Sequence, residues 1–151
     1  MIKNVRHFGI VVTDMDNSLK FYRDFLDLKI ERELHESGNF LDKILNKKDV
    51  KVHTIKMSAK EGDTLVELLK FESEQKKPLD NFEVSNIGAS HVAFTVENLD
   101  ETYEKLTSFG VKFNSPPQIS SDGYAKVTFC YDPDGVPIEL VEVLDPEIAK
   151  K

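Results

Sequence analysis

Residues 5–12 read VRHFGIVV and residues 89–96 read ASHVAFTV, and these two stretches decide the fold. Written one above the other at an offset of 84 (91 − 7), they align His7 with His91 and place an apolar run after each histidine. Self-similarity at a fixed offset indicates one structural unit present twice. Segments with helical spacing follow both stretches, so each half is predicted to begin as a strand that leads through a turn into a helix.

The predicted helices have recognisable start signals. Asp14 or Thr13 can cap the first helix, and Asn98 can cap the second, because each carries a side-chain oxygen that accepts a backbone N–H. Gly110 is placed to end the second helix. Apolar residues follow at helical intervals, and the predicted buried stripes are Met15, Leu19, Tyr22 and Leu26 in the first half and Leu99, Tyr103 and Leu106 in the second.

The two halves also end alike, in strands that carry a glutamate at 65–68 (LVEL) and 137–140 (PIEL). The separation from histidine to glutamate is 60 residues (67 − 7) in the first half and 48 (139 − 91) in the second. The difference of 12 residues predicts one insertion at 37–48, where residues 40–45 suit a short extra helix. Each half is therefore predicted to run strand–helix–strand–strand–strand.

Each half contributes one histidine and one glutamate at equivalent positions. Gly9 and Ala93 share the faces of the histidines and leave space beside the rings. The two glutamates lie inside apolar strands, where an unpaired carboxylate is costly to bury. A divalent first-row metal would satisfy all four groups, which are His7, Glu67, His91 and Glu139. The alternative is a pair of hydrogen-bonded strand histidines with glutamates that face water.

Two further histidines, His35 and His53, have no partner in the repeat. Each is flanked by charged or β-forming residues. They are interpreted as ordinary strand or surface histidines.

Composition narrows the class of protein. The 20 Lys+Arg against 27 Asp+Glu give a net charge of −7, which disfavours nucleic acid as a partner. The longest apolar run, about residues 8–12, is far shorter than a membrane span, so no membrane partner is expected. The single cysteine, Cys130, fits a reducing, cytoplasmic location and is interpreted as a small apolar strand residue.

In combination, these motifs resemble the vicinal oxygen chelate superfamily, the group that contains glyoxalase I, methylmalonyl-CoA epimerase, extradiol dioxygenases and bleomycin- and fosfomycin-resistance proteins. The resemblance implies an α+β chain with residues 1–151 as one such domain. It would comprise two tandem βαβββ modules whose curved mixed sheets enclose a metal-binding cleft. The predicted modules are 1–72 and 89–145, joined by a linker at 73–88. Homodimers are common in the superfamily, so a homodimer is expected.

The glyoxalase I (lactoylglutathione lyase) branch is the most similar, because His7, Glu67, His91 and Glu139 match its four ligand positions. The resemblance implies a divalent cofactor (Zn, Ni, Co, Mn or Fe) and an enzyme acting on a small-molecule substrate. That enzyme removes a proton next to a metal-polarised carbonyl. Glu139 would be the leading base, and Glu67 a ligand or second acid–base group.

The substrate and the exact reaction stay open. Val11 and Phe71 stand where glutathione-binding members carry an arginine and an asparagine, which leaves a glutathione adduct, another thiol adduct, a CoA thioester or a small carbonyl compound. The alternatives are an enzyme like methylmalonyl-CoA epimerase or a non-catalytic drug-binding resistance protein. Phe129, where dioxygenases usually carry a tyrosine, disfavours ring cleavage. Residues 114–123 are predicted as a loop that could close over the cleft.

Overall fold

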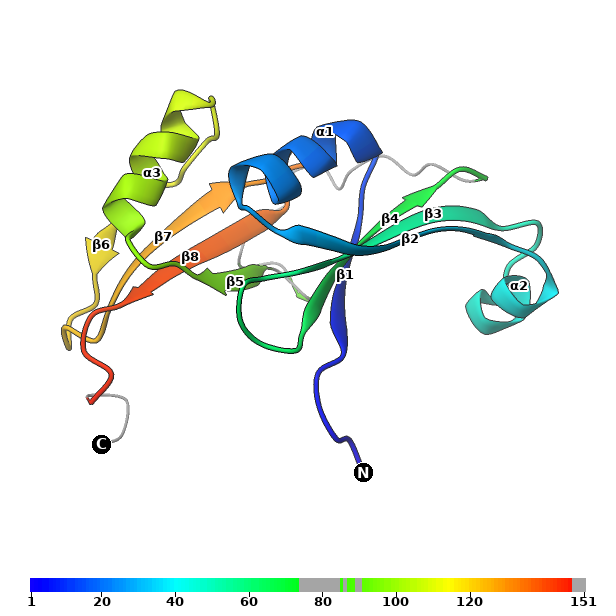
Figure 1. Cartoon of the computed structure of the whole chain (residues 1–151), viewed down its shortest axis with the longest axis horizontal. Helices are drawn as coiled ribbons and strands as arrows, with labels where there is room; N and C mark the ends of the chain where they lie inside the picture. Colours follow the sequence, from blue (N-terminus) through cyan, green and yellow to red (C-terminus); the bar gives the residue numbers. More distant parts are fainter. Residues whose placement is uncertain (74–84, 86, 89–90, 148–151) are drawn as a thin grey trace. The chain divides into compact units, whose positions relative to one another are not determined.

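The structure is a computed structural model that describes residues 1–73, 85, 87–88 and 91–147. The chain divides into two compact units, Met1–Pro78 and Leu79–Lys151 (Figure 1). Most of the predicted linker at 73–88 lies outside the described residues, as do residues 89 and 90 at the start of the second repeated stretch.

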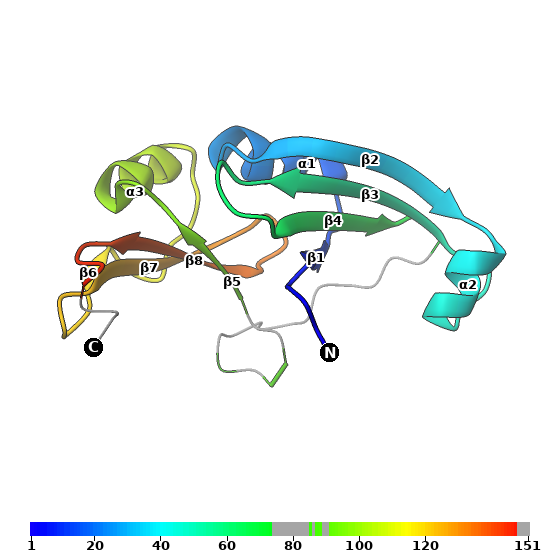
Figure 2. The ribbon, with the colours of Figure 1, turned by 60° about the horizontal axis from the view of Figure 1, so that its bottom comes forward.

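The first unit is built on a four-stranded mixed sheet with the strand order β1-β4-β3-β2. β1 and β4 run parallel, and the other two pairs are antiparallel. Figure 2 shows that β2 and β3 curve along their length. The elements are β1 (His7–Val11), α1 (Met15–Leu19), η1 (Lys20–Phe25), β2 (Lys29–Ser37), α2 (Asn39–Leu45), β3 (Lys51–Ser58) and β4 (Leu65–Phe71).

The second unit repeats this arrangement without the insertion. Its sheet has the order β5-β8-β7-β6, and again the first and last strands of the unit, β5 and β8, run parallel. Its elements are β5 (Val92–Thr95), α3 (Leu99–Ser108), β6 (Gln118–Ile119), β7 (Ala125–Tyr131) and β8 (Pro137–Val143). Two tandem βαβββ modules of class α+β are therefore present, as the sequence repeat predicted.

Both predicted helix caps form. Asp14 Oδ1 accepts a hydrogen bond from the Asn17 N–H at 2.9 Å, and Asn98 Oδ1 accepts one from the Glu101 N–H at 3.1 Å. Gly110 follows the end of α3 with a φ of 82°, a backbone conformation that glycine adopts without strain. Among the described residues, no helix is both long and apolar enough to cross a membrane.

The first helix departs from regular spacing after one turn. It continues into the π-helical segment η1, where the Leu26 N–H donates to the Phe21 carbonyl five residues earlier. The wider turn places the adjacent residues Phe21 and Tyr22 both in the core. The predicted stripe is right for Met15 and Tyr22, but Leu19 and Leu26 are only half-buried.

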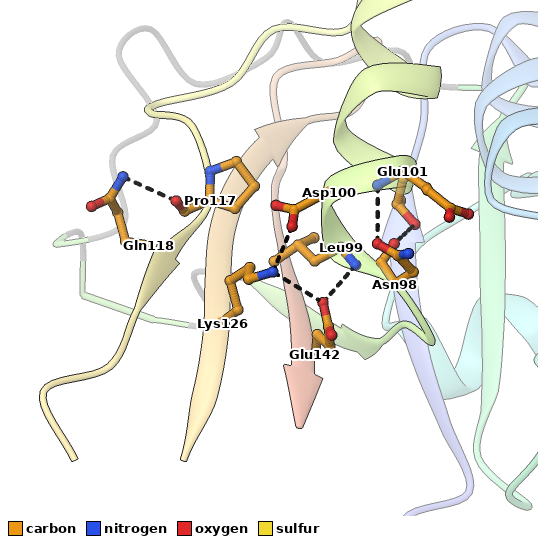
Figure 3. Close-up of polar contacts among 9 residues, drawn as sticks. Asn98, Leu99, Asp100, Glu101, Pro117, Gln118, Lys126 and Glu142 are labelled. Atoms are coloured by element: carbon orange, nitrogen blue, oxygen red, sulfur yellow. Dashed lines mark hydrogen bonds and ion pairs between the residues drawn. The ribbon is translucent and has the colours of Figure 1, made fainter. Parts of the chain in front are cut away.

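Polar side chains fix the start of α3 to its sheet (Figure 3). The Leu99 N–H donates to Glu142 Oε2 at 2.8 Å, so a β8 carboxylate satisfies one of the free amides of the helix. Lys126 Nζ, from β7, lies 2.6 Å from Asp100 Oδ2 and 3.6 Å from Glu142 Oε2. Leu99 and Leu106 are fully buried. The apolar stripe and this charged network therefore hold α3 in place together.

The insertion in the first half is the helix α2, close to the predicted range 40–45. It lies at the end of the β2–β3 hairpin (Figure 2). The Asp42 carboxylate accepts the backbone N–H groups of Asp49 and Val50 and so closes the segment that returns to β3. Leu41 anchors the helix in a small apolar cluster with Val50, Val52, Leu69 and Phe71.

The predicted loop at 114–123 contains the short edge strand β6, which pairs with β7. The loop prediction is wrong for Gln118 and Ile119, because a two-residue strand is too short to show an alternating pattern. The chain turns back at Ser120 and Asp122, whose side chains are joined by a hydrogen bond of 2.6 Å. A segment rich in proline and serine thus supplies β6, the edge strand that completes the four-stranded sheet of the second module.

Cys130 of β7 is fully buried, as expected of a small apolar strand residue. Burial, together with the nearby charge of Asp132, raises the pKa of the Cys130 thiol to about 12. The thiol is therefore protonated at neutral pH and is not a nucleophile.

Candidate functional site

Two neighbouring parallel strands form the first predicted histidine–glutamate pair. β1 and β4 pair with Gly9 opposite Glu67, and since side chains alternate across a strand, His7 lies on the same face as both. His7 Nε2 is 3.1 Å from Glu67 Oε2. The glutamate side chain is 10% exposed and the histidine 33%, so a solute can reach the pair from the histidine side.

The second pair repeats this arrangement in the other module. β5 and β8 pair with Ala93 opposite Glu139, which brings His91 beside the glutamate. His91 Nε2 is 3.3 Å from Glu139 Oε2, and the side chains are 37% and 23% exposed. Each predicted pair is thus formed within its own module. The binding of one ion by all four residues stays a prediction.

The distances within the pairs suit metal coordination. Two donor atoms bound at about 2.1 Å lie about 3.0–3.4 Å apart at octahedral or tetrahedral angles. The separations of 3.1 and 3.3 Å fall in that range. His7 Nδ1 is buried and has no hydrogen-bond partner in the described part of the chain, so the ring proton belongs on Nε2, facing Glu67. A metal bound at Nε2 would require the ring proton to move to Nδ1.

The two pairs differ in the residue that is the register partner of the glutamate on the antiparallel neighbouring strand. Lys56 of β3 is the register partner of Glu67, and its Nζ lies 3.3 Å from Glu67 Oε1. The equivalent partner of Glu139 is Phe129, whose ring meets the edge of His91 at 5.4 Å and 81°. One glutamate therefore has a cation beside it, whereas the other has an aromatic ring.

Lys56 was not among the predicted site residues. The repeat could not reveal it, because the equivalent position in the other half is Phe129. The register of β3 with β4 is the one signal that points to Lys56, and the length of the turn at 59–64 sets that register.

Apolar side chains surround the first pair on its face of the sheet. Val11 is the register partner of Leu69, and Val11 is 61% exposed. Phe71 lies two residues further along the same face of β4. A Cβ at Gly9 would lie only 3.2 Å from Leu69 Cδ1. The glycine therefore leaves space on this face of the sheet. The surface next to His7 therefore suits an uncharged part of a ligand.

Comparisons with known proteins identify the family. Residues 4–140 match the Glyoxalase/Bleomycin resistance protein/Dioxygenase superfamily, and the chain belongs to it. The lactoylglutathione lyase of Schizosaccharomyces pombe is 32% identical over 145 residues, covering 91% of this chain and 46% of that protein. The uncharacterized protein YaeR of Escherichia coli is 30% identical over 146 residues, covering 93% of this chain and 97% of YaeR.

A solved structure shows the same fold. The crystal structure of a glyoxalase family protein from Bacillus cereus superposes with a TM-score of 0.85 at 22% identity, covering 96% of this chain and 97% of that one. The resemblance inferred from the sequence motifs is confirmed at the level of family and fold.

Proposed function

We propose that this chain is a metal-dependent lyase or isomerase of the glyoxalase type, in which His7, Glu67, His91 and Glu139 hold one divalent ion. The main support for the proposal is that each module pairs one histidine with one glutamate in the same way, each pair with a donor separation that suits coordination. The similarity to a lactoylglutathione lyase adds support. Two imidazoles and two carboxylates accept Zn, Ni, Co, Mn or Fe.

A bound divalent ion would polarise a substrate carbonyl as a Lewis acid and acidify the C–H group beside it. Glu139 is the proposed base that accepts this proton, because its side chain is more exposed than that of Glu67 and its register partner on β7 is Phe129, not a lysine. Glu67 is better suited to remain a ligand, since Lys56 already engages its second oxygen. Its alternative proposed role is that of a second acid–base group. Phe129 packs against His91 and limits the movement of that ring.

The apolar face beside His7 bears on the substrate class. Val11 and Phe71 offer no charge to the carboxylates of glutathione. We therefore favour a small carbonyl compound, a different thiol adduct or a CoA thioester. The expected form is a cytoplasmic homodimer, in line with the superfamily and with a single buried cysteine.

The first test is the metal content of the purified, untagged protein by elemental analysis. The His91→Ala variant is expected to hold about one equivalent less metal than the wild type. The Glu139→Gln variant is expected to keep the metal and lose turnover. Glu104→Gln, the same change at an exposed site on α3, is the matched control.

Activity is assayed with the hemithioacetal of methylglyoxal and, separately, with methylmalonyl-CoA. Turnover of either substrate that disappears in Glu139→Gln supports the proposal and names the substrate class. Equal metal content in the wild type and His91→Ala, both as purified and after addition of Ni, Zn, Co or Mn, would overturn it. A drug-binding protein would then be the better account.

A further inference from the structure

The two histidines without a repeat partner meet on the sheet of the first module. His35 of β2 and His53 of β3 are directly opposite one another in the antiparallel register. Glu33 lies two residues before His35 and therefore shares its face. His53 and Lys56 are three residues apart on one strand, so they point to opposite faces. Because Lys56 shares the face of Glu67, the histidines lie on the other face from the proposed catalytic metal.

Close contacts join these side chains into one cluster. The two imidazole rings stack at 4.1 Å between centroids with an interplanar angle of 13°. His53 Nε2 is 2.7 Å from Glu33 Oε1, and His35 Nδ1 is 3.8 Å from Glu72 Oε1. One donor atom each from Glu33, His35 and His53 lies within 4.8 Å of the others.

The donor set has the chemistry of a transition-metal site. Two imidazoles with carboxylate oxygens suit Zn²⁺, Cu²⁺ or Ni²⁺. Stacked imidazoles cannot hydrogen-bond to each other, so each ring has a nitrogen available for another partner. Lys70, the β4 register partner of His53, opposes a cation, but the carboxylates of Glu33 and Glu72 outweigh its single charge.

The geometry requires little rearrangement to hold an ion. At the tetrahedral angles of a Zn²⁺ site, donor atoms bound at about 2.1 Å lie about 3.4 Å apart, and the observed limit is 4.8 Å. Side-chain rotation alone can close this gap. His53 is the fixed member at 14% exposure, whereas His35 and Glu33 are 66% and 53% exposed and free to turn.

We infer that Glu33, His35 and His53 form a second divalent metal site of the Zn²⁺ class, with Glu72 as a fourth donor or as the group that orients His35. The site lies wholly within one module and on the face opposite His7 and Glu67. It is separate from the proposed catalytic ion and does not depend on it.

The test is a Zn²⁺ titration of the untagged full chain by isothermal calorimetry in a His7→Ala/His91→Ala background, which removes the first proposed site. This background is expected to bind about one equivalent of Zn²⁺. Adding His35→Phe/His53→Phe should abolish that binding while keeping an aromatic pair across the strands. Thermal unfolding of the metal-free variants checks that the fold is kept.

A matched pair of glutamate-to-glutamine changes tests whether Zn²⁺ binding depends on the carboxylate of Glu33 in particular. Glu33→Gln should weaken Zn²⁺ binding by about tenfold or more. Glu36→Gln, on the same strand but the opposite face, should leave it unchanged. The chain has four histidines, so the ring nitrogens of His35 and His53 can be followed in ¹H–¹⁵N spectra of the wild type as Zn²⁺ is added.

Zn²⁺-dependent shifts at both rings would support the site. A Zn²⁺ stoichiometry that His35→Phe/His53→Phe leaves unchanged would overturn it, as would ring signals that Zn²⁺ does not move. Loss of the first site is read separately, from the His7→Ala/His91→Ala step. Failure of one proposal is therefore distinguishable from failure of the other.

Discussion

Replacing Lys56 with methionine is expected to weaken the metal-free fold and, at the same time, to tighten divalent metal binding at Glu67. In the free protein the lysine Nζ lies 3.3 Å from Glu67 Oε1, with side chains 24% and 10% exposed. Any cation that binds Glu67 competes with this ammonium group for the negative charge. Removing the ammonium group therefore favours the ion and leaves the His7 contact as the remaining ion pair of the buried carboxylate among the described residues.

The size of the effect follows from the contact. At an effective dielectric constant of about 20, two unit charges 3.3 Å apart attract by about 5 kcal/mol, before the cost of desolvation. The net contribution of a hydrogen bond between charged groups is about 1.5–3 kcal/mol. We expect the metal-free variant to lose stability of that order. Metal binding should tighten by about tenfold to a hundredfold, since 1.4 kcal/mol is a factor of ten.

The measurement is a Zn²⁺ titration by calorimetry together with urea unfolding of the metal-free protein, both in the His35→Phe/His53→Phe background. Lys29→Met is the matched control, because it changes the net charge equally but removes an ion pair with Glu31 that is 79% and 41% exposed. Such an exposed pair contributes little. Equal Zn²⁺ affinity in both variants, or weaker binding in Lys56→Met, would refute the reasoning.

Three further outcomes are expected. Cys130, whose thiol pKa burial raises to about 12, should resist aromatic disulfide reagents at pH 8 until the protein is unfolded; fast reaction of the native protein would contradict its burial. The hydrogen bond that Lys126 donates to Asp100 raises the pKa of Lys126 above 10.5. The stabilising contribution of this contact is therefore complete below pH 10.5 and is lost as the pH rises through the raised value. The gap in melting temperature between wild type and Lys126→Met should therefore narrow at alkaline pH, and a gap constant to pH 12 would argue against the contact. Leu106→Ala should cost about 2–5 kcal/mol in urea unfolding, against a small effect for Leu144→Ala, because Leu106 is fully buried and Leu144 is 40% exposed.

The sequence predicted most of the fold, because the same pattern of histidine, strand, helix and glutamate occurs twice. The repeat located both strands of each parallel pair, and alternation placed Gly9 on the face of His7. The register of β1 with β4 is what brings Glu67 to that face. The repeat could not predict Lys56 as a site residue, because Lys56 comes beside Glu67 only through the pairing of β3 with β4. Nor could it predict the stacking of His35 on His53, because the inserted helix α2 joins their strands and leaves no turn signature that fixes the register. The π-helical turn η1 could not be predicted either, since a backbone hydrogen bond between residues five apart has no distinct residue pattern.

The position of α2 has a consequence for how such a module can diversify. The insertion enters at the tip of the β2–β3 hairpin, whereas the register of Gly9 with Glu67 depends on β1 and β4. Chain length can therefore change at the tip without moving either metal donor. Through Leu41 the inserted helix also reaches Phe71, on the face of β4 that carries Glu67. Lengthening, shortening or exchanging residues 38–50 thus offers a route to reshape the ligand-binding surface by design while the chemistry stays fixed.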